Sequence, residues 1–310
     1  MRNENRVCNT RFCLVDARPT GKDAEFHAPF PAMMGRVRFR VMMDIVESLP
    51  PGSLVLDLGA RTGSFSTARG DLTVVRVDLD APPASASGGY VRADAARLPF
   101  RGASFDAIVA NHSLEHFARL EDSLREIGRV VKPGGSLYVA VPDAGTFTDR
   151  VYRWLGRGGG HVNAFRQPAG VIGPIVKWTS LPHRSTTVLF SSLSFLNSHN
   201  FSSRPPRRIA LFAYGNERFL AWFSWALRCA DGVLGTRLSV YGWEFRFGGA
   251  ASQSPREAWI NVCVRCGSGA SEAYLRAAGA VRRALCMEAY TCPACGGRNW
   301  LFRDTGVPDR

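Results

Sequence analysis

Short apolar runs alternate with amphipathic stretches through the first half of the chain. Four runs rich in β-branched and aliphatic residues predict buried strands: residues 54–58, 73–77, 107–110 and 136–141. Residues 37–46 and 120–131 repeat their apolar positions at helical spacing, and both stretches run into turns of proline and glycine. Strands that alternate with helices predict an α/β fold, in which a parallel sheet is wound with right-handed crossovers and carries helices on both faces.

The regular alternation ends after Pro142. Residues 155–185 are rich in glycine, proline and arginine, and we expect them to form a long loop over the mouth of the sheet. Residues 186–197 and 208–215 predict later strands. Residues 217–235 predict a helix with aromatic side chains on several sides. We expect this helix to be buried against the sheet, and contact with a membrane surface or a lipid-like substrate is the alternative.

The 310-residue chain, of which 45% is hydrophobic, can bury a sizeable core in one large domain or two smaller ones. Its eight cysteines are too few for a secreted disulfide framework. The N-terminal residues contain no apolar core of signal-peptide length, and the chain has no uninterrupted run of about 18 apolar residues. We therefore expect a cytoplasmic protein without a transmembrane segment.

The formal net charge of +13 is unevenly distributed. Residues 1–150 carry 19 basic and 18 acidic side chains, whereas residues 151–310 carry 20 basic and 8 acidic ones. A basic half is typical of a surface for phosphates, nucleic acid or anionic lipid. All but three of the basic residues are arginines, however, and a GC-biased coding sequence would produce this excess without any anionic partner. The charge leaves both interpretations open.

The most informative stretch is VLDLGARTGSF, residues 55–65, in which a predicted strand runs into a turn. Asp57 stands near the end of the strand, and Gly59 and Gly63 lie in the turn. Open α/β sheets build nucleotide pockets in this way, because glycine lets the backbone approach a ligand closely. The spacing differs from G-x-G-x-x-G, which disfavours a dinucleotide site. A carboxylate before the turn suits an amino group or a hydroxyl better than a phosphate, which favours S-adenosylmethionine (SAM).

Four segments follow one another along the chain and together cover roughly residues 50–145: DLGARTG, VVRVDLD, ADAARLPFRGASFDAIVANHSLEHF and LREIGRVVKPGGSLYVAVP. In this order they resemble the class I SAM-dependent methyltransferases, and within them the type 11 branch of quinone and sterol-like small-molecule methyltransferases. The resemblance implies a Rossmann-like sheet and SAM as the methyl donor. We assign residues 1–34 to an N-terminal lead-in, residues 35–250 to the methyltransferase domain, and residues 251–310 to a C-terminal segment.

The resemblance gives the turn residues defined roles in binding SAM. Asp57 resembles the acid that helps hold the positively charged amino acid end of SAM. Gly59 and Gly63 match the glycines over which the cofactor backbone lies. Arg61 departs from the family pattern, which usually has glycine at this position. An arginine here either points outward or sits above the methionine carboxylate of SAM.

Three later residues complete the set of cofactor contacts that the resemblance implies. Asp78 resembles the acid that accepts hydrogen bonds from both ribose hydroxyls, and Asp80 is the nearby alternative. Asp94 resembles the acid that accepts a hydrogen bond from the adenine amino group, beside the backbone of Ala95. Asn111, at the end of the fourth predicted strand, should line the space near the sulfonium.

Two histidines are the candidates for catalysis. Methyl transfer from a sulfonium is an in-line displacement, so a general base is needed only where the nucleophile must lose a proton. His116 lies in the segment NHSLEH, either as a catalytic residue or as a hydrogen-bonded wall of the pocket. His161 follows three glycines in the stretch expected to cover the active site, and we expect it to contact the acceptor.

The residues after the fourth predicted strand narrow the class of acceptor. The chain reads NHSL there, not the N-P-P-Y or D-P-P-Y of enzymes that methylate base amino groups. We therefore expect a small-molecule, glycan or lipid-linked acceptor. One alternative is an RNA-directed methyltransferase, in which the basic half of the chain holds phosphates. Another is a non-catalytic module that binds SAM or a protein.

Two Cys-x-x-Cys pairs occur near the C-terminus: Cys263 with Cys266, and Cys292 with Cys295. Glycine follows each pair, and four thiolates on such turns provide the tetrahedral ligands of a structural zinc ion. The segment resembles a zinc ribbon, although the gap between the pairs exceeds the usual spacing of about 15–20 residues. Residues 271–285, inside the gap, predict a helix. Cys286 is a competing ligand, and a redox role for one pair is the alternative.

Overall fold

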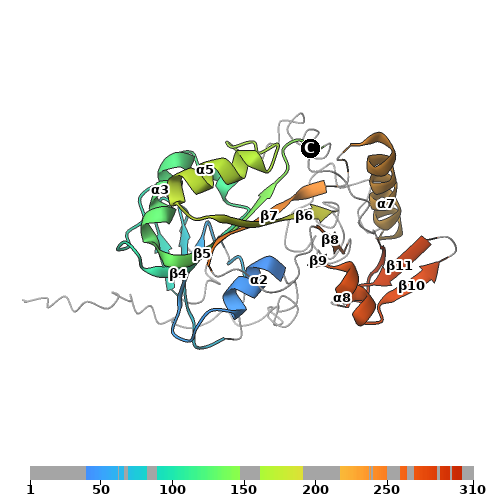
Figure 1. The fold of residues 1–310 in the computed structure, drawn as a ribbon, viewed down its shortest axis with the longest axis horizontal. Helices are drawn as coiled ribbons and strands as arrows, with labels where there is room; N and C mark the ends of the chain where they lie inside the picture. Colours follow the sequence, from blue (N-terminus) through green and yellow to red (C-terminus); the bar gives the residue numbers. More distant parts are fainter. Residues whose placement is uncertain are drawn as a thin grey trace, which may run out of the picture.

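The computed structural model describes residues 40–61, 63–65, 69–81, 89–146, 161–190, 217–236, 238, 240–249, 259–263, 269–284, 287–293 and 295–301. In chain order the elements are α2 Arg40–Glu47, β1 Leu54–Leu58, β2 Thr73–Asp78, β3 Gly89–Arg92, β4 Phe105–Asn111, the 3-10 helix η1 Leu114–His116, α3 Leu120–Val130, β5 Val131–Pro142, α5 Ala169–Thr179, β6 His183–Phe190, α7 Glu217–Leu234, β7 Val240–Gly248, β8 Trp259–Val262, β9 Gly269–Ala270, α8 Glu272–Ala277, β10 Val281–Ala284, β11 Met287–Thr291 and β12 Arg298–Trp300. Figure 1 shows a central sheet with helices against it and a smaller sheet beside α7.

A mixed sheet of nine strands forms the centre, in the order β3-β2-β1-β4-β5-β7-β6-β8-β9. From β3 to β5 every pair of neighbours is parallel, and the four strands predicted in this region are confirmed. β7 then runs antiparallel to both β5 and β6. The prediction of a parallel sheet is therefore confirmed for the first five strands. Beyond them the sheet is mixed, because β7 runs against both of its neighbours where the alternation of strands and helices along the chain has ended.

Helices cover both faces of the sheet, as predicted (Figure 1). α3 and α5 pack on the face that carries Leu56 and Leu58 of β1. α2 packs on the opposite face, which carries Val55. Because side chains alternate along a strand, Asp57 also lies on the α2 face of the sheet.

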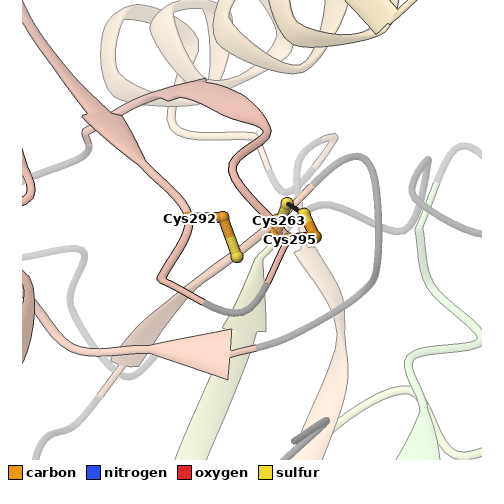
Figure 2. Close-up of side chains that lie close together, drawn as sticks. All are labelled: Cys263, Cys292 and Cys295. Atoms are coloured by element: carbon orange, nitrogen blue, oxygen red, sulfur yellow. Dashed lines mark hydrogen bonds between the residues drawn. The ribbon is translucent and has the colours of Figure 1, made fainter. Parts of the chain in front are cut away.

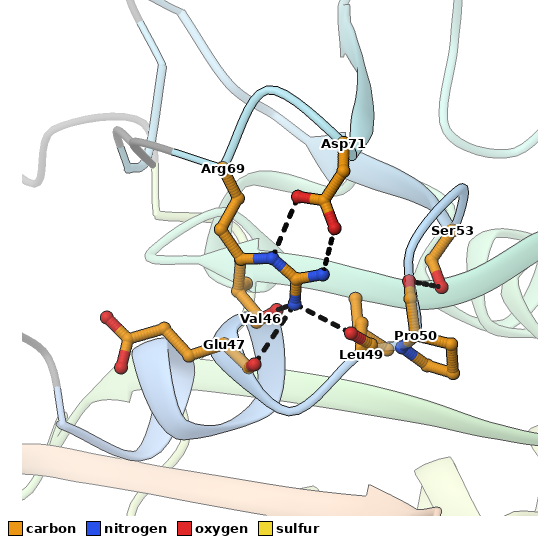
Figure 3. Close-up of polar contacts among 7 residues, drawn as sticks. All are labelled: Val46, Glu47, Leu49, Pro50, Ser53, Arg69 and Asp71. Carbon is orange, nitrogen blue, oxygen red and sulfur yellow. Dashed lines mark hydrogen bonds and ion pairs between the residues drawn. The ribbon is translucent and has the colours of Figure 1, made fainter.

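An arginine from the loop before β2 holds the C-terminal end of α2 (Figure 3). Arg69 donates hydrogen bonds to the carbonyl oxygens of Glu47 (3.0 Å) and Leu49 (2.6 Å), and it also pairs with Asp71. A cation at this position satisfies carbonyl groups that have no partner within the helix, and it complements the helix dipole. The contact fixes α2 to the loop between β1 and β2, next to the strand that carries Asp57.

The expectation of a long loop over residues 155–185 is wrong where the structure describes this stretch. It contains α5 and the start of β6. Val171, Ile175 and Thr179 recur at helical spacing and are buried. The glycines and prolines of this stretch, including Pro174 inside the helix, made this apolar face hard to predict from the sequence.

α7 confirms the helix predicted at residues 217–235. The ring of Trp225 lies 6.3 Å from the ring of Trp300 in β12, so this side of the helix packs on the three-stranded sheet β10-β11-β12. We had expected this helix to pack on the main sheet. Trp222 and Val233 of the same helix are exposed. None of the helices that the structure describes has both the length and the apolar character needed to cross a membrane.

The stretch 271–285, predicted as a helix, instead forms the short helix α8 and the strand β10. Gly279 adopts a left-handed φ of +61° just after the helix, a conformation that ends helices. β8 lies in the C-terminal segment assigned from the sequence, yet it pairs in parallel with β6 of the main sheet. The predicted lead-in at 1–34 and the predicted strand at 208–215 lie outside the described residues.

Candidate active site

Polar side chains lie at or near the carboxyl ends of three neighbouring strands. Asp57 is the penultimate residue of β1, Asp78 is the last of β2, and Asn111 is the last of β4. Asp57 is in register with Arg76 on one side and with Val109 on the other, so the three strands end at the same edge of the sheet. Ligands of open α/β sheets bind at this edge.

The glycine turn after β1 brings the backbone close to the segment after β4. Gly59 has a φ of +74°, and its N–H donates to the carbonyl oxygen of Val77 at 2.8 Å. A Cβ on Gly59 would lie 2.4 Å from the Cβ of Ser113. Gly63 has a φ of +105°. Both glycines therefore occupy conformations that other residues rarely adopt, and Gly59 also fills a space with no room for a side chain.

Arg61, the departure from the family pattern, adopts the glycine-like backbone conformation at a φ of +44°. Its N–H donates to Asp78 Oδ2 at 2.8 Å, which ties the turn to the end of β2. Its side chain is exposed. The structure thus agrees with the first of the two placements expected for this arginine, the outward one.

Asp57 is fully buried and only partly satisfied. Its Oδ2 accepts a hydrogen bond from the N–H of Ser64 at 2.8 Å and lies 3.9 Å from Arg76 Nε. Its Oδ1 is buried and has no hydrogen-bond partner among the residues that the structure describes. Burial raises the pKa of Asp57 above its ordinary value, and the hydrogen bond from Ser64 opposes that rise. A cationic amino group, such as that of SAM, would supply the missing donor and the compensating charge.

Asp78 and Asp94, predicted to bind ribose and adenine, already accept hydrogen bonds from the protein. Asp78 Oδ1 accepts from the N–H of Asp80 at 3.1 Å, in addition to the bond from the turn. Asp94 accepts from the N–H of Ala96 at 2.9 Å and from Arg119 at 2.8 Å, and these contacts hold the pKa of its carboxyl below the ordinary value. A carboxylate has about four acceptor positions, so each acid retains capacity for a ligand. Ala95 lies half-buried beside Asp94.

The end of β4 offers further buried polar atoms. Asn111 Oδ1 and Ser113 Oγ are buried without a hydrogen-bond partner among the described residues. His112, between them, has a left-handed φ of +52°. Buried polar groups are generally hydrogen-bonded, so these atoms suit a site for a polar ligand.

The two candidate histidines, which come from distant parts of the sequence, are neighbours. The rings of His116 and His161 are 4.8 Å apart and meet edge to face at 72°. Glu115 joins them: ligand atoms of all three residues lie within 4.8 Å of one another. Glu115 is not among the sequence candidates, although it stands beside His116 in the NHSLEH segment. The signal that identifies it is burial, since only 1% of this acidic residue is exposed.

Three of the four predicted zinc ligands converge in the C-terminal segment, as Figure 2 shows. Cys263 follows β8, and Cys292 and Cys295 lie in the turn between β11 and β12. The sulfur atoms of Cys263 and Cys295 are 3.7 Å apart, and the N–H of Gly297 approaches Cys295 Sγ at 3.4 Å. Cys266, the fourth predicted ligand, and Cys286, its competitor, lie outside the described residues.

Comparison with known proteins agrees with this geometry. Residues 56–139 match the sequence model of the methyltransferase domain family. The demethylmenaquinone methyltransferase of Beutenbergia cavernae is 36% identical over 115 residues, which cover 34% of this chain and 48% of that protein. The malonyl-acyl-carrier protein O-methyltransferase of Erwinia pyrifoliae is 31% identical over 148 residues, which cover 44% and 52%. The chain thus spans about half the length of these curated relatives.

A solved structure, that of a SAM-dependent methyltransferase from Methanosarcina mazei, aligns with a TM-score of 0.44 at 12% identity and covers 69% of this chain and 99% of that one. The match at residues 56–139 contains the strand ends and the glycine turn described above. Residues 56–139 therefore match the methyltransferase domain family.

Proposed function

We propose that the protein transfers a methyl group from SAM to a small-molecule acceptor. The observation that carries the proposal is the buried Asp57, whose Oδ1 has no partner among the described residues and which stands directly before the Gly59 turn. An anionic atom left in this state is costly unless a ligand supplies a donor. The positively charged amino group of SAM has the required chemistry.

The remaining strand-end residues fit the rest of the cofactor. Asp78 would accept from the ribose hydroxyls, Asp94 would accept from the adenine amino group beside Ala95, and Asn111 would line the space at the sulfonium. SAM supplies an already activated methyl group when it is bound. The chain's own residues then have to bind the donor, align the acceptor and exclude water.

The acceptor class is inferred from the matched relatives and from the segment after β4. The two relatives are named for different acceptors, demethylmenaquinone and malonyl-acyl-carrier protein, and neither name fixes the acceptor of this chain. Both names support a small metabolite or a carrier-bound one. The NHSL sequence after the fourth strand supports the same class, since it lacks the signature of base-amino methylation.

We propose, in addition, that the C-terminal segment binds a structural zinc ion through Cys263, Cys266, Cys292 and Cys295. The convergence of three of these sulfurs supports the proposal. Asn299 Nδ2 lies 3.3 Å from Cys263 Sγ, a polar contact of the kind that stabilises a thiolate. Four cysteine ligands leave no open coordination position, so the ion would hold the segment together and take no part in methyl transfer.

Methyl-labelled SAM provides the test of function. The purified full-length protein is incubated with labelled SAM and, separately, with the small-molecule, lipid and RNA fractions of the cells that produce it. The proposal predicts that label moves into a compound of the small-molecule or lipid fraction. Label in RNA alone would favour the RNA-directed alternative, and SAM binding without transfer to any fraction would favour the non-catalytic one.

A further inference from the structure

A second group of chemically capable side chains lies beside the cofactor residues. Glu115, His116 and His161 present one carboxylate oxygen and two imidazole nitrogens within 4.8 Å of one another. Among the described residues, the only other such group is the cysteine cluster far along the chain. Glu115 is buried, His161 is half-buried and His116 is exposed, so the group opens toward solvent on one side.

The carboxylate of Glu115 is the part of this group that most requires a ligand. Only 1% of the residue is exposed, and its Oε2 is buried without a hydrogen-bond partner among the described residues. The nearest cationic candidate, His112 Nδ1, lies 3.7 Å from the other oxygen, Oε1, which is too far for a hydrogen bond. A buried carboxylate in this state needs a cation or a donor.

Backbone contacts fix the two segments that contribute the group. The N–H groups of Val162 and Asn163 donate to the carbonyl oxygen of Glu115 at 2.9 and 3.0 Å. The side-chain amide of Asn163 donates to the carbonyl oxygens of Leu114 (2.9 Å) and Phe117 (2.8 Å). These bonds hold the residues next to His161 against η1, which carries Glu115 and His116. The three side chains are therefore held together by their backbones before any ligand binds.

We propose that Glu115, His116 and His161 bind a divalent transition-metal ion. Two imidazoles and one carboxylate form a ligand set that suits such ions and leaves coordination positions open. A structural histidine pair would account for the ring contact but not for the buried, unpartnered carboxylate oxygen between the two segments. The exposure of His116 leaves the outer side of the ion accessible to a further ligand.

The position of the group suggests the chemistry of that further ligand. η1 comes directly after Ser113, which packs on Gly59 of the cofactor turn, so the ion lies on the same edge of the sheet as the SAM residues. If the proposed function holds, the ion binds an acceptor through a hydroxyl oxygen and lowers the pKa of that hydroxyl. The hydroxyl proton passes to water, and the oxygen then bonds to the methyl carbon. The carbon–sulfur bond breaks at the same time, and its electron pair stays on sulfur.

The test uses Mn²⁺ as the probe, because Mn²⁺ favours carboxylate and water ligands over the thiolates of the cysteine cluster. Metal-stripped full-length protein is titrated with Mn²⁺ in the absence of SAM, and the signal of free Mn²⁺ is followed by electron paramagnetic resonance. The proposal predicts binding at one site. E115Q, H116N and H161N should each raise the Kd for Mn²⁺ at least about tenfold, because even the loss of a group that only supports a metal ligand lowers metal affinity by that factor. E121Q, which changes an exposed carboxylate of α3, should leave the Kd unchanged.

Two outcomes would overturn the proposal: no Mn²⁺ binding by the wild-type protein, or equal binding by the wild type, H116N and H161N. The histidine variants keep the test decisive if the buried E115Q variant does not fold, which circular dichroism establishes. SAM binding is measured separately by calorimetry on the same preparations. If the protein binds Mn²⁺ but not SAM, the proposed function is wrong and the metal site is supported. If it binds SAM but not Mn²⁺, the metal site is wrong and the proposed function is supported.

Discussion

Gly59 and Ser113 are packed so closely that a Cβ on Gly59 would lie 2.4 Å from the Ser113 Cβ. Gly59 belongs to the turn expected to carry SAM, and Ser113 immediately precedes the 3-10 helix that carries Glu115 and His116. The contact therefore joins the donor side of the site to the side where the acceptor is expected. A change at either residue should disturb both sides together.

Replacement of Gly59 by alanine tests this contact, and Gly52 provides a matched control. Both glycines have similar left-handed φ values, +74° and +79°, but a Cβ on Gly52 would meet nothing within 4 Å. G52A should lower the free energy of unfolding by about 1–2 kcal/mol through backbone strain alone. G59A should cost about 1–3 kcal/mol more through overpacking, and it alone should weaken SAM binding. Denaturant unfolding and calorimetry measure the two effects, and equal SAM affinity in both variants would contradict the account.

Substitutions at Asp94 and Arg119 distinguish two roles for Asp94: binding the cofactor, or forming a surface ion pair with Arg119. The two side chains are 45% and 47% exposed, so their mutual attraction is screened by water. D94A should raise the Kd for SAM about threefold to tenfold, the loss expected for one hydrogen bond. R119A should leave that Kd unchanged or lower it, because the carboxylate becomes freer to accept from adenine. If both variants weaken SAM binding equally, Asp94 acts by holding Arg119 and the adenine assignment fails.

The first half of the fold could be predicted from the sequence because each of its strands is a local pattern. The runs around Asp57 and Asn111 are apolar, bounded by turns, and long enough to be recognised singly. The insertion of β7 between β5 and β6 could not be predicted in the same way, because it depends on which distant segments pair. Likewise α5 was not predicted, because glycines and a proline lie within it. Its packing against α3 stabilises the helix in spite of these residues.

For the site, the strand-end carboxylates and the histidines could be named from sequence, but their relationships could not. His116 and His161 meet because the backbone N–H groups of Val162 and Asn163 bind the carbonyl of Glu115. Backbone hydrogen bonds of this kind cannot be predicted from residue types, because almost every residue has the same backbone donor and acceptor. The same holds for the burial of Glu115, which its residue type does not indicate.

Glu244 of β7 should make the stability of the protein depend on pH. Its carboxyl is buried, and burial raises its pKa from 4.5 to about 7, with the Tyr138 hydroxyl opposing the rise and the Asp44 carboxylate adding to it. A raised pKa in the folded state means that the stabilising contribution is complete below about pH 4.5 and is lost as the pH rises through about 7. Relative to E244Q, the wild type should lose about 3 kcal/mol of unfolding free energy over this interval. Parallel pH profiles of the two proteins would show that Glu244 does not titrate in this way.

Removal of a cysteine ligand tests the proposed zinc ion. The purified protein should contain zinc, and C292S should lose it and unfold at a lower temperature, since the free energy of metal binding is largely folding free energy. C229S, which changes an exposed cysteine of α7, should keep both the zinc and the melting temperature. If the wild type contains no zinc and thiol titration finds the two cysteines of one Cys-x-x-Cys pair oxidised together, the redox alternative replaces the zinc proposal.

The central claim is that the domain binds SAM through Asp57, and calorimetry of SAM binding to the wild type and to D57N tests it most directly. Asparagine can still accept the hydrogen bond from Ser64 but carries no charge. We predict that the wild type binds SAM and that D57N raises the Kd at least about tenfold, the loss expected for a hydrogen bond to a charged group. Burial raises the pKa of Asp57, which means that its charge destabilises the folded protein when SAM is absent. Without SAM, the free energy of unfolding of D57N should therefore equal or exceed that of the wild type. SAM binding of equal strength by both proteins, or no binding by the wild type, would contradict the account.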